Sequence, residues 1–247
     1  MNEFPKRIFA HRGLNTVAPE NTMAAFRLGA QRGCRWFETD VDVLGDGTVV
    51  IIHDTTLDRT TDHSGSYYNL VCEDLSHIDA GSWFSPQYAG ERIPTLREFV
   101  TFMNEKRVNC NIEVKSNEAG KAMTLLLIDR LLEELERLGP GREVIISSFN
   151  HVLLSKLKDK APKLPVACLY ETCALYDDWK SMLELVGADY IHPEDQGLTR
   201  QKVQEFRSAG FGVNVWTVNS AARANELFNW GATGIFTDIA DQIPSPR

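Results

Sequence analysis

Short β-branched runs alternate regularly with longer amphipathic stretches along this chain, and this alternation limits the possible folds more than any other feature of the sequence. Such an alternation predicts βα units, whose strands lie parallel in one sheet and whose helices cover it. Eight strands favour a closed barrel over an open, doubly wound sheet. The eight expected strands span residues 7–10, 36–43, 108–114, 143–147, 165–169, 189–192, 212–218 and 233–237.

The stretches between these strands have the spacing of amphipathic helices. One helix start is marked by a capping-box pattern, Thr95-Leu-Arg-Glu98, in which the two end residues each satisfy an amide of the first turn. The expected helices span residues 21–33, 95–106, 117–138, 150–160, 176–186, 199–209 and 219–230.

One segment interrupts the alternation. After the second expected strand, Asp46-Gly47 marks a tight turn and residues 49–52 have the pattern of a further strand, followed by a long stretch rich in Ser, Asp, Tyr and Gly. A loop this long in a compact domain usually has a function or forms a small subdomain. The 247 residues match the length of a one-domain barrel. We therefore predict an α/β TIM (β/α)8 barrel over residues 1–247, with a small insertion after strand 2 at about 55–92.

Charge and composition exclude several classes of protein. The formal net charge of −8 argues against binding to nucleic acid or to an anionic membrane, because both require clustered lysine and arginine. The five cysteines are odd in number and lack the spacing of a zinc site or a disulfide framework. The polar start leaves no room for a signal peptide, and no apolar run approaches the roughly 18 residues of a membrane span. We expect a cytoplasmic protein without stable membrane association, and the sequence indicates no oligomeric state.

Acidic side chains occupy two neighbouring expected strands, toward the strand ends where active sites form in parallel α/β folds. Glu38 and Asp40 are two residues apart and so point to the same face of one strand, and Glu113 lies on the next strand. Converging carboxylates repel one another unless a cation lies among them, and hard oxygen ligands favour Mg²⁺ or Ca²⁺ over zinc. The sequence therefore predicts a divalent-metal site at these three residues and leaves the choice between Mg²⁺ and Ca²⁺ open.

Cations and histidines flank the acidic cluster. Arg12 and Lys115 would supply the local positive charge that a phosphodiester requires, or they could neutralise the acids in buried salt bridges. His11 and His53 each follow an apolar run. Histidine titrates near neutral pH, so the two together indicate an acid–base pair, although either alone could be a hydrogen-bonded structural residue.

These residues belong to motifs that occur in a fixed order. The motifs are His11-Arg12-Gly13, Pro19-Glu20-Asn21-Thr22, Glu38-x-Asp40, Asp46-Gly47, His53-Asp54, Leu57-Asp58-Arg59-Thr60, Pro94-Thr95-Leu96, Asn111-Ile-Glu113-x-Lys115, Ser147-Ser148-Phe149, Trp216-Thr217-Val218-Asn219 and Gly234-Ile-Phe-Thr237-Asp238. Each motif is weak alone, but the ordered set is specific. The set resembles the glycerophosphodiester phosphodiesterases of the bacterial cytoplasmic type, and the resemblance covers nearly the whole chain.

The resemblance implies a TIM barrel that hydrolyses glycerophosphodiesters, such as glycerophosphocholine or glycerophosphoethanolamine, to sn-glycerol 3-phosphate and an alcohol. It implies catalysis by His11 and His53 beside the metal. It leaves open which histidine is the base, and whether the glycerol 2-hydroxyl or water attacks phosphorus. Phe149, Trp216 and Phe236 lie near strand ends and could form an apolar wall for the glycerol carbons, although aromatic residues there more often pack in the core. The resemblance favours Trp216.

Three rival functions fit the sequence less well. A related barrel phospholipase, of the phosphatidylinositol phospholipase C or sphingomyelinase D type, would have an apolar or basic rim and a secretion signal, which the sequence lacks. A Schiff-base enzyme built on Lys115 is disfavoured because neighbouring acids raise the pKa of a lysine. A catalytically silent phosphodiester-binding protein would be expected to have lost a histidine or a metal carboxylate, and all five are present.

Overall fold

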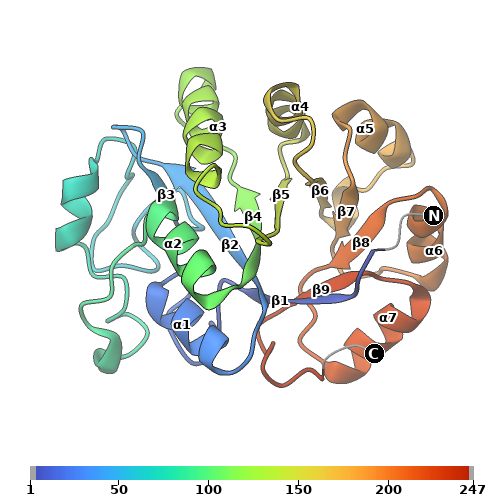
Figure 1. The fold of residues 1–247 in the computed structure, drawn as a ribbon, viewed down its shortest axis with the longest axis horizontal. Coiled ribbons are helices and arrows are strands. Elements are labelled where there is room, and N and C mark those ends of the chain that lie inside the picture. The colour runs from blue at the N-terminus through green and yellow to red at the C-terminus, as the bar shows by residue number, and fades with distance from the viewer. Residues whose placement is uncertain (1–3, 245–247) are drawn as a thin grey trace.

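The fold is a closed ring of parallel strands in the computed structural model, which describes residues 4–244. The sheet order is β1-β9-β8-β7-β6-β5-β4-β2-β3, and a further pairing of β1 with β2 closes the ring (Figure 1). Among the strands of residues 4–244, only β3 (Val49–Ile51) runs antiparallel, and it pairs with the C-terminal part of β2. The predicted TIM barrel is therefore confirmed. Within residues 4–244, the eight barrel strands are β1 (Arg7–His11), β2 (Trp36–Val43), β4 (Asn109–Val114), β5 (Val144–Ser148), β6 (Val166–Tyr170), β7 (Tyr190–Pro193), β8 (Gly212–Val215) and β9 (Gly234–Thr237).

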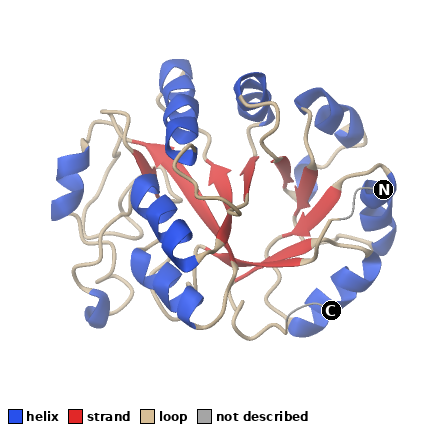
Figure 2. Ribbon diagram, in the orientation of Figure 1, coloured by secondary structure: helices blue, strands red, loops and turns tan. Residues whose placement is uncertain are grey.

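The α-helices lie outside the ring of strands, as Figure 2 shows in blue around the red strands. Their apolar faces and the outer faces of the strands form the main hydrophobic core. No helix within residues 4–244 is long and apolar enough to span a bilayer. The helices are α1 (Met23–Gln31), α2 (Leu96–Lys106), α3 (Lys121–Leu135), α4 (His151–Lys160), α5 (Trp179–Val186), α6 (Arg200–Ser208) and α7 (Ala221–Trp230), with short 3-10 helices η1 (Cys72–His77), η2 (Pro86–Tyr88) and η3 (Thr172–Ala174).

Local side-chain chemistry explains where two helices begin. The predicted capping box is present, since the Thr95 hydroxyl accepts from the amide of Glu98 and the Glu98 carboxylate accepts from the amide of Thr95. The start of α3 was predicted at Asn117 and is wrong by four residues, because the Asn117 side chain accepts from the amide of Ala119 in a turn and Gly120 has a positive φ of 88°.

The strand predicted at residues 212–218 is shorter than expected. β8 ends at Val215, and beyond it Trp216 makes only an isolated bridge to Glu194. The indole of Trp216 donates a hydrogen bond to the carbonyl of His192 at 2.9 Å. The amide of Val218 donates to the carbonyl of Phe236 at 2.8 Å. The β-branched composition of this segment thus continues past the point where the backbone leaves the barrel.

Apolar side chains fill part of the barrel interior and leave its other end to polar residues. The interior cluster contains Phe9, Ile145, Ala167, Tyr190 and Phe236. Ile145 and Tyr190 lie at or near the N-terminal ends of their strands, so this cluster closes that side of the barrel. The carboxyl ends of the strands are the remaining side at which polar groups can gather.

A separate small core supports the segment between β3 and α2, which forms the teal region at the left of Figure 1. Asp42 anchors this segment to β2. Its buried carboxylate accepts hydrogen bonds from the hydroxyls of Tyr67 and Tyr68 and from the side-chain amide of Asn117, each at 2.8 Å. One carboxylate therefore joins the inserted segment, β2 and the loop before α3.

Replacing Asp42 with alanine should destabilise the protein, because it leaves buried hydroxyl donors without an acceptor. We expect the free energy of unfolding to fall by about 2–4 kcal/mol, measured by chemical denaturation. Asp129→Ala, which removes a surface ion pair with Lys160, is the control and should change it by less than about 1 kcal/mol. Equal stability of the two variants would contradict the anchoring role of Asp42.

Candidate active site

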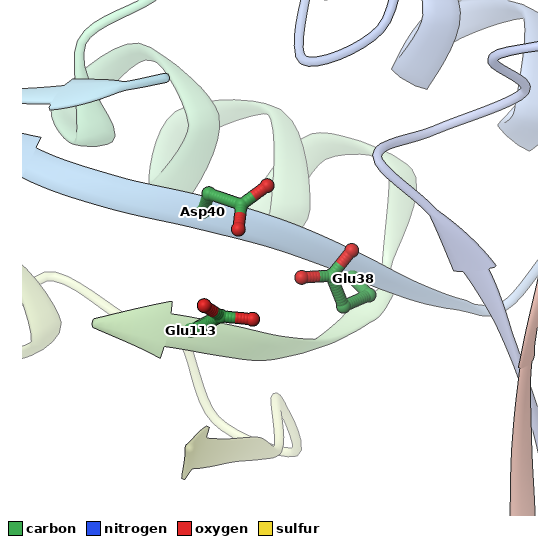
Figure 3. Close-up of side chains that lie close together, drawn as sticks. All are labelled: Glu38, Asp40 and Glu113. Atoms are coloured by element: carbon green, nitrogen blue, oxygen red, sulfur yellow. The ribbon is translucent and has the colours of Figure 1, made fainter. Parts of the chain in front are cut away.

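Three carboxylates converge at the carboxyl ends of β2 and β4. Alternation along β2 points Glu38 and Asp40 to the interior, and the sheet register places Asp40 beside Glu113 of β4. One oxygen from each of the three lies within 4.8 Å of the others. Figure 3 shows the three side chains pointing toward a common space from the two strands. The structure thus brings together the three acids that the sequence predicted as metal ligands.

Burial and mutual repulsion set the charge state of these acids. Burial and the charge of Asp40 hold the pKa of Glu38 and the pKa of Glu113 above the ordinary range. Burial would also raise the pKa of Asp40, but the charges of Arg12 and Lys115 outweigh it and hold that pKa below its usual range. A divalent cation would replace the protons that the first two acids tend to keep. Because the donors are all carboxylate oxygens, the set fits a hard cation such as Mg²⁺ or Ca²⁺.

Arg12 reaches the acids from a tight turn that follows β1. Its backbone has a φ of 54°, and its amide donates to Glu38 Oε2 at 3.0 Å. The next residue, Gly13, has a φ of 85°, and a Cβ there would lie 2.7 Å from the Cβ of Ala25. The guanidinium contacts Asp40 at 3.3 Å and Glu20 at 2.8 Å. The His-Arg-Gly motif therefore turns the backbone so that Arg12 faces the cluster.

Lys115 lies two residues beyond Glu113 and points to the same side of the sheet. Its ammonium is 2.7 Å from Glu113 Oε1 and 3.5 Å from Asp40 Oδ1. Burial would lower the pKa of Lys115, but these two carboxylates outweigh it and raise that pKa. A protonated lysine cannot attack a carbonyl, which argues against the Schiff-base alternative. Both cations thus pair with the acids and also face the site.

Each of the two histidines has one ring nitrogen held by a carboxylate. His11 Nδ1 lies 2.7 Å from Asp238 Oδ1, and His11 Nε2 lies 3.9 Å from Glu38 Oε2. His53 Nδ1 lies 2.7 Å from Asp54 Oδ1. A carboxylate on Nδ1 orients the ring and favours the tautomer that presents Nε2 to a reactant. The arrangement fits two proton-transfer groups at one site.

One cavity of about 390 Å³ joins these groups to apolar side chains across the barrel mouth. Phe149 and Trp216 face each other edge to face, with ring centroids 5.6 Å apart, and Phe149 is 41% exposed. Phe236 borders the cavity but is buried and stacks on Phe9, as a core residue does. The described residues that line the cavity are His11, Arg12, Glu38, His53, Asn111, Glu113, Lys115, Ser147, Phe149, Leu169, Glu171, Trp216, Thr217 and Phe236.

Several residues of the site were not singled out from the sequence. Asp238 accepts from His11 and, at 2.6 Å each, from the side chains of Asn15 and Asn219. Asn111 is buried, donates to the hydroxyl of Ser147 at 2.8 Å, and has no hydrogen-bond partner for its carbonyl oxygen among the described residues. Their only sequence signal is membership of the ordered motifs, which assigns them no role.

The charge of Asp54 should contribute to stability in a defined pH range. Hydrogen bonds from Arg59 and His53 hold the pKa of Asp54 at about 2, whereas an unfolded aspartate has a pKa of about 3.9. Because the folded-state pKa is the lower one, this stabilisation is complete above the unfolded value and is lost as the pH falls toward 2. We expect the stability difference between wild type and Asp54→Asn, measured by denaturation, to be constant above about pH 5 and to shrink between about pH 4 and 2. A difference that stays the same at pH 3 and pH 7 would contradict this prediction.

The chain resembles known proteins over nearly all of its length. A family model described as the glycerophosphoryl diester phosphodiesterase family matches residues 11–242. A glycerophosphodiester phosphodiesterase of Caldanaerobacter subterraneus subsp. tengcongensis is 35% identical over 236 residues, which cover 96% of this chain and 95% of the relative. A glycerophosphodiester phosphodiesterase of Bacillus subtilis is 33% identical and covers 96% of this chain and 85% of the relative.

A solved structure agrees with these sequence relatives. A phosphodiesterase of Oleispira antarctica, in complex with the product sn-glycerol-3-phosphate, superimposes with a TM-score of 0.91 at 32% sequence identity. The alignment covers 97% of this chain and 95% of that protein. The resemblance predicted from the ordered motifs is confirmed, and the chain belongs to the glycerophosphoryl diester phosphodiesterase family, a family of phosphoric diester hydrolases.

Proposed function

We propose that this chain hydrolyses glycerophosphodiesters, such as glycerophosphocholine and glycerophosphoethanolamine, to sn-glycerol 3-phosphate and an alcohol. The observation that carries the proposal is the convergence of three carboxylates, two of which line one cavity together with two histidines and two cations. The product bound by the Oleispira antarctica relative supports the identity of the phosphate product.

The proposed metal ligands are Glu38, Asp40 and Glu113. A bound Mg²⁺ or Ca²⁺ would supply Lewis-acid stabilisation of the negative charge that builds on the phosphoryl oxygens. A divalent cation would add two positive charges to a group in which the carboxylates outnumber the neighbouring Arg12 and Lys115. The added positive charge favours binding of a singly charged phosphodiester despite the net charge of −8 on the chain.

Arg12 and Lys115 are the proposed phosphate-binding side chains. The guanidinium can make two parallel hydrogen bonds to phosphoryl oxygens, and the ammonium acts as a point charge. Phe149 and Trp216 are proposed to pack against the glycerol carbons, since both border the cavity on its apolar side. Polar and apolar sides of one cavity would then orient the two ends of the substrate.

His11 and His53 are the proposed acid and base. One removes a proton from the attacking hydroxyl, and the other gives a proton to the alcohol oxygen as its bond to phosphorus breaks. Asp238 and Asp54 hold the rings so that the second nitrogen faces the reaction. If the glycerol 2-hydroxyl attacks, the product is a cyclic phosphate that water then opens to sn-glycerol 3-phosphate, and the same two histidines can act in reverse roles. If water attacks, that phosphate forms directly.

Product identification by ³¹P NMR tests this function. The enzyme would be incubated with a panel of glycerophosphodiesters and, separately, with lysolipids in micelles, after chelation and reloading with either Mg²⁺ or Ca²⁺. We expect sn-glycerol 3-phosphate from the soluble substrates, and a transient cyclic phosphate would identify the two-stage route. Turnover of lipids alone would favour the barrel phospholipase alternative, and binding of substrate without turnover would favour the silent binding protein.

Two further expectations accompany the proposed function. The barrel and its insertion are proposed to act as one catalytic unit over residues 1–247, because β3, the small core of the insertion and the barrel are joined through Asp42. A cytoplasmic location stays a prediction.

A further inference from the structure

Arg59 belongs to the inserted segment and makes four hydrogen bonds to two carboxylates. Its Nε and Nη2 donate to the two oxygens of Asp54 at 2.6 and 2.9 Å. Its Nη1 and Nη2 donate to the two oxygens of Glu20 at 2.8 Å each. Arg59 is not among the described residues that line the cavity. Its guanidinium therefore bridges two acids and does not itself border the cavity.

Each of these acids in turn holds one group of the proposed site. Glu20 Oε1 accepts from the Arg12 guanidinium at 2.8 Å. Asp54 Oδ1 lies 2.7 Å from His53 Nδ1. Arg59 is thus one carboxylate away from the proposed phosphate-binding arginine, at the end of β1, and one carboxylate away from a proposed acid–base histidine, beyond β3.

Charge and burial show that both carboxylates are ionised partners of Arg59. Glu20 is 13% exposed, and burial would raise its pKa, but Arg59 and Arg12 lower that pKa below the ordinary value. The hydrogen bonds from Arg59 are the largest influence that lowers the pKa of Asp54. A planar guanidinium can donate two hydrogen bonds to each of two carboxylates, whereas the lysine ammonium acts as a point charge and cannot.

We propose that Arg59 is a positioning residue for hydrolysis, which holds Glu20 and Asp54 so that Arg12 and His53 keep a fixed distance and orientation. The proposal rests on the proposed function of the site. It assigns the inserted segment a part in catalysis, since this segment supplies the one side chain among residues 4–244 that bonds to both carboxylates. A displacement of about 1 Å at a reacting group can lower the rate by about 100-fold. Loss of the hydrogen bonds from Arg59 should therefore have a measurable effect on the rate of hydrolysis.

The first experiment compares Arg59→Ala and Arg59→Lys with the wild type on sn-glycero-3-phosphocholine. We expect Arg59→Ala to lower kcat/KM by on the order of 100-fold, and Arg59→Lys to lower it by roughly 10-fold, because one point charge cannot hold both acids. Arg97→Ala is the matched control. Arg97 of α2 also donates two hydrogen bonds to a carboxylate, that of Glu134 of α3, through its Nε and Nη2. That variant should stay within about twofold of the wild type.

The second experiment tests the two carboxylates that Arg59 contacts, Glu20 and Asp54, one at a time. Glu20→Gln should act through Arg12, weakening the affinity for sn-glycerol 3-phosphate in calorimetry and raising KM more than it lowers kcat. Asp54→Asn should act through His53 and lower kcat more than it raises KM. In the Glu20→Gln/Asp54→Asn background, Arg59→Ala should lower kcat/KM by less than about threefold, because its effect passes through residues already changed.

Two results would overturn the inference while leaving the proposed function intact. One is an Arg59→Ala variant with kcat/KM within about twofold of an active wild type. The other is an equal loss on Arg59→Ala in the wild-type and double-variant backgrounds, which would mean that Arg59 acts independently of the two acids. Should Arg59→Ala fail to fold, the lysine variant, checked by thermal melting against Arg97→Ala, decides in its place. Absence of turnover by wild type and Arg97→Ala alike would instead contradict the proposed function.

Discussion

Replacing His11 or His53 with alanine is expected to lower kcat on sn-glycero-3-phosphocholine by on the order of 100- to 10,000-fold, the range that a positioned acid or base supplies. Each ring is held through Nδ1 by a carboxylate 2.7 Å away, which leaves the second nitrogen for proton transfer. One histidine would take the proton of the nucleophile and the other would protonate the leaving alcohol. Loss of either histidine alone should therefore lower kcat by this amount. Steady-state kinetics and single-turnover measurements would check the effect on the chemical step.

His63 provides the matched control. It follows Asp62 in the chain and pairs with it through Nδ1 at 2.7 Å, as His53 pairs with Asp54, but it lies in the inserted segment and is 47% exposed. His63→Ala should therefore leave kcat within about twofold of the wild type. Wild-type rates in both His11→Ala and His53→Ala would contradict the acid–base assignment.

Removal of the divalent cation is expected to lower kcat by an amount similar to the loss of a histidine. Chelation with EDTA should lower kcat by roughly 1,000-fold, which corresponds to about 4 kcal/mol of lost transition-state stabilisation. Added Mg²⁺ or Ca²⁺ should restore the rate. It should also raise the Tm of the chelated protein, because a ligand that binds only the folded state stabilises it. The thermal shift tests the metal site independently of activity.

A variant of one proposed ligand makes this test specific. Glu113→Gln should require much more metal for half-maximal activity and should lose the thermal shift on metal addition. Glu143→Gln is the control, because Glu143 pairs with Arg7 at the opposite, N-terminal end of the barrel. Full turnover in EDTA, or equal thermal shifts in the two variants, would contradict the metal site.

The fold could be predicted because its signals are local and repeated. Hydrophobic patterning predicted every barrel strand to within one residue at its start, and the ends were also close except at β8. There the apolar pattern runs on past Val215, while the indole of Trp216 bonds to a neighbouring strand. The predicted start of α3 is wrong because of a similar bond between a side chain and the backbone. The Asn117 side chain accepts from a backbone amide and so competes with the helix for it.

The acidic cluster could be predicted for a different reason. Strand alternation places Glu38 and Asp40 on one face, and parallel neighbours in a barrel share one active end, so no knowledge of side-chain packing is needed. The roles of the histidines depended far more on the resemblance to a known family, because a lone histidine after a strand has several ordinary explanations.

The barrel, the family and the three acids with their flanking histidines and cations could all be inferred from the amino-acid sequence, since each follows from periodicity, chain order or residue type. The partners that complete the site depend instead on how the chain folds in three dimensions. Asp238 meets His11 across 227 positions of sequence, and Arg59 meets Glu20 across 39, because ring closure and the folding of the insertion bring distant segments together. Such contacts depend on the three-dimensional path of the chain, and no local spacing encodes them.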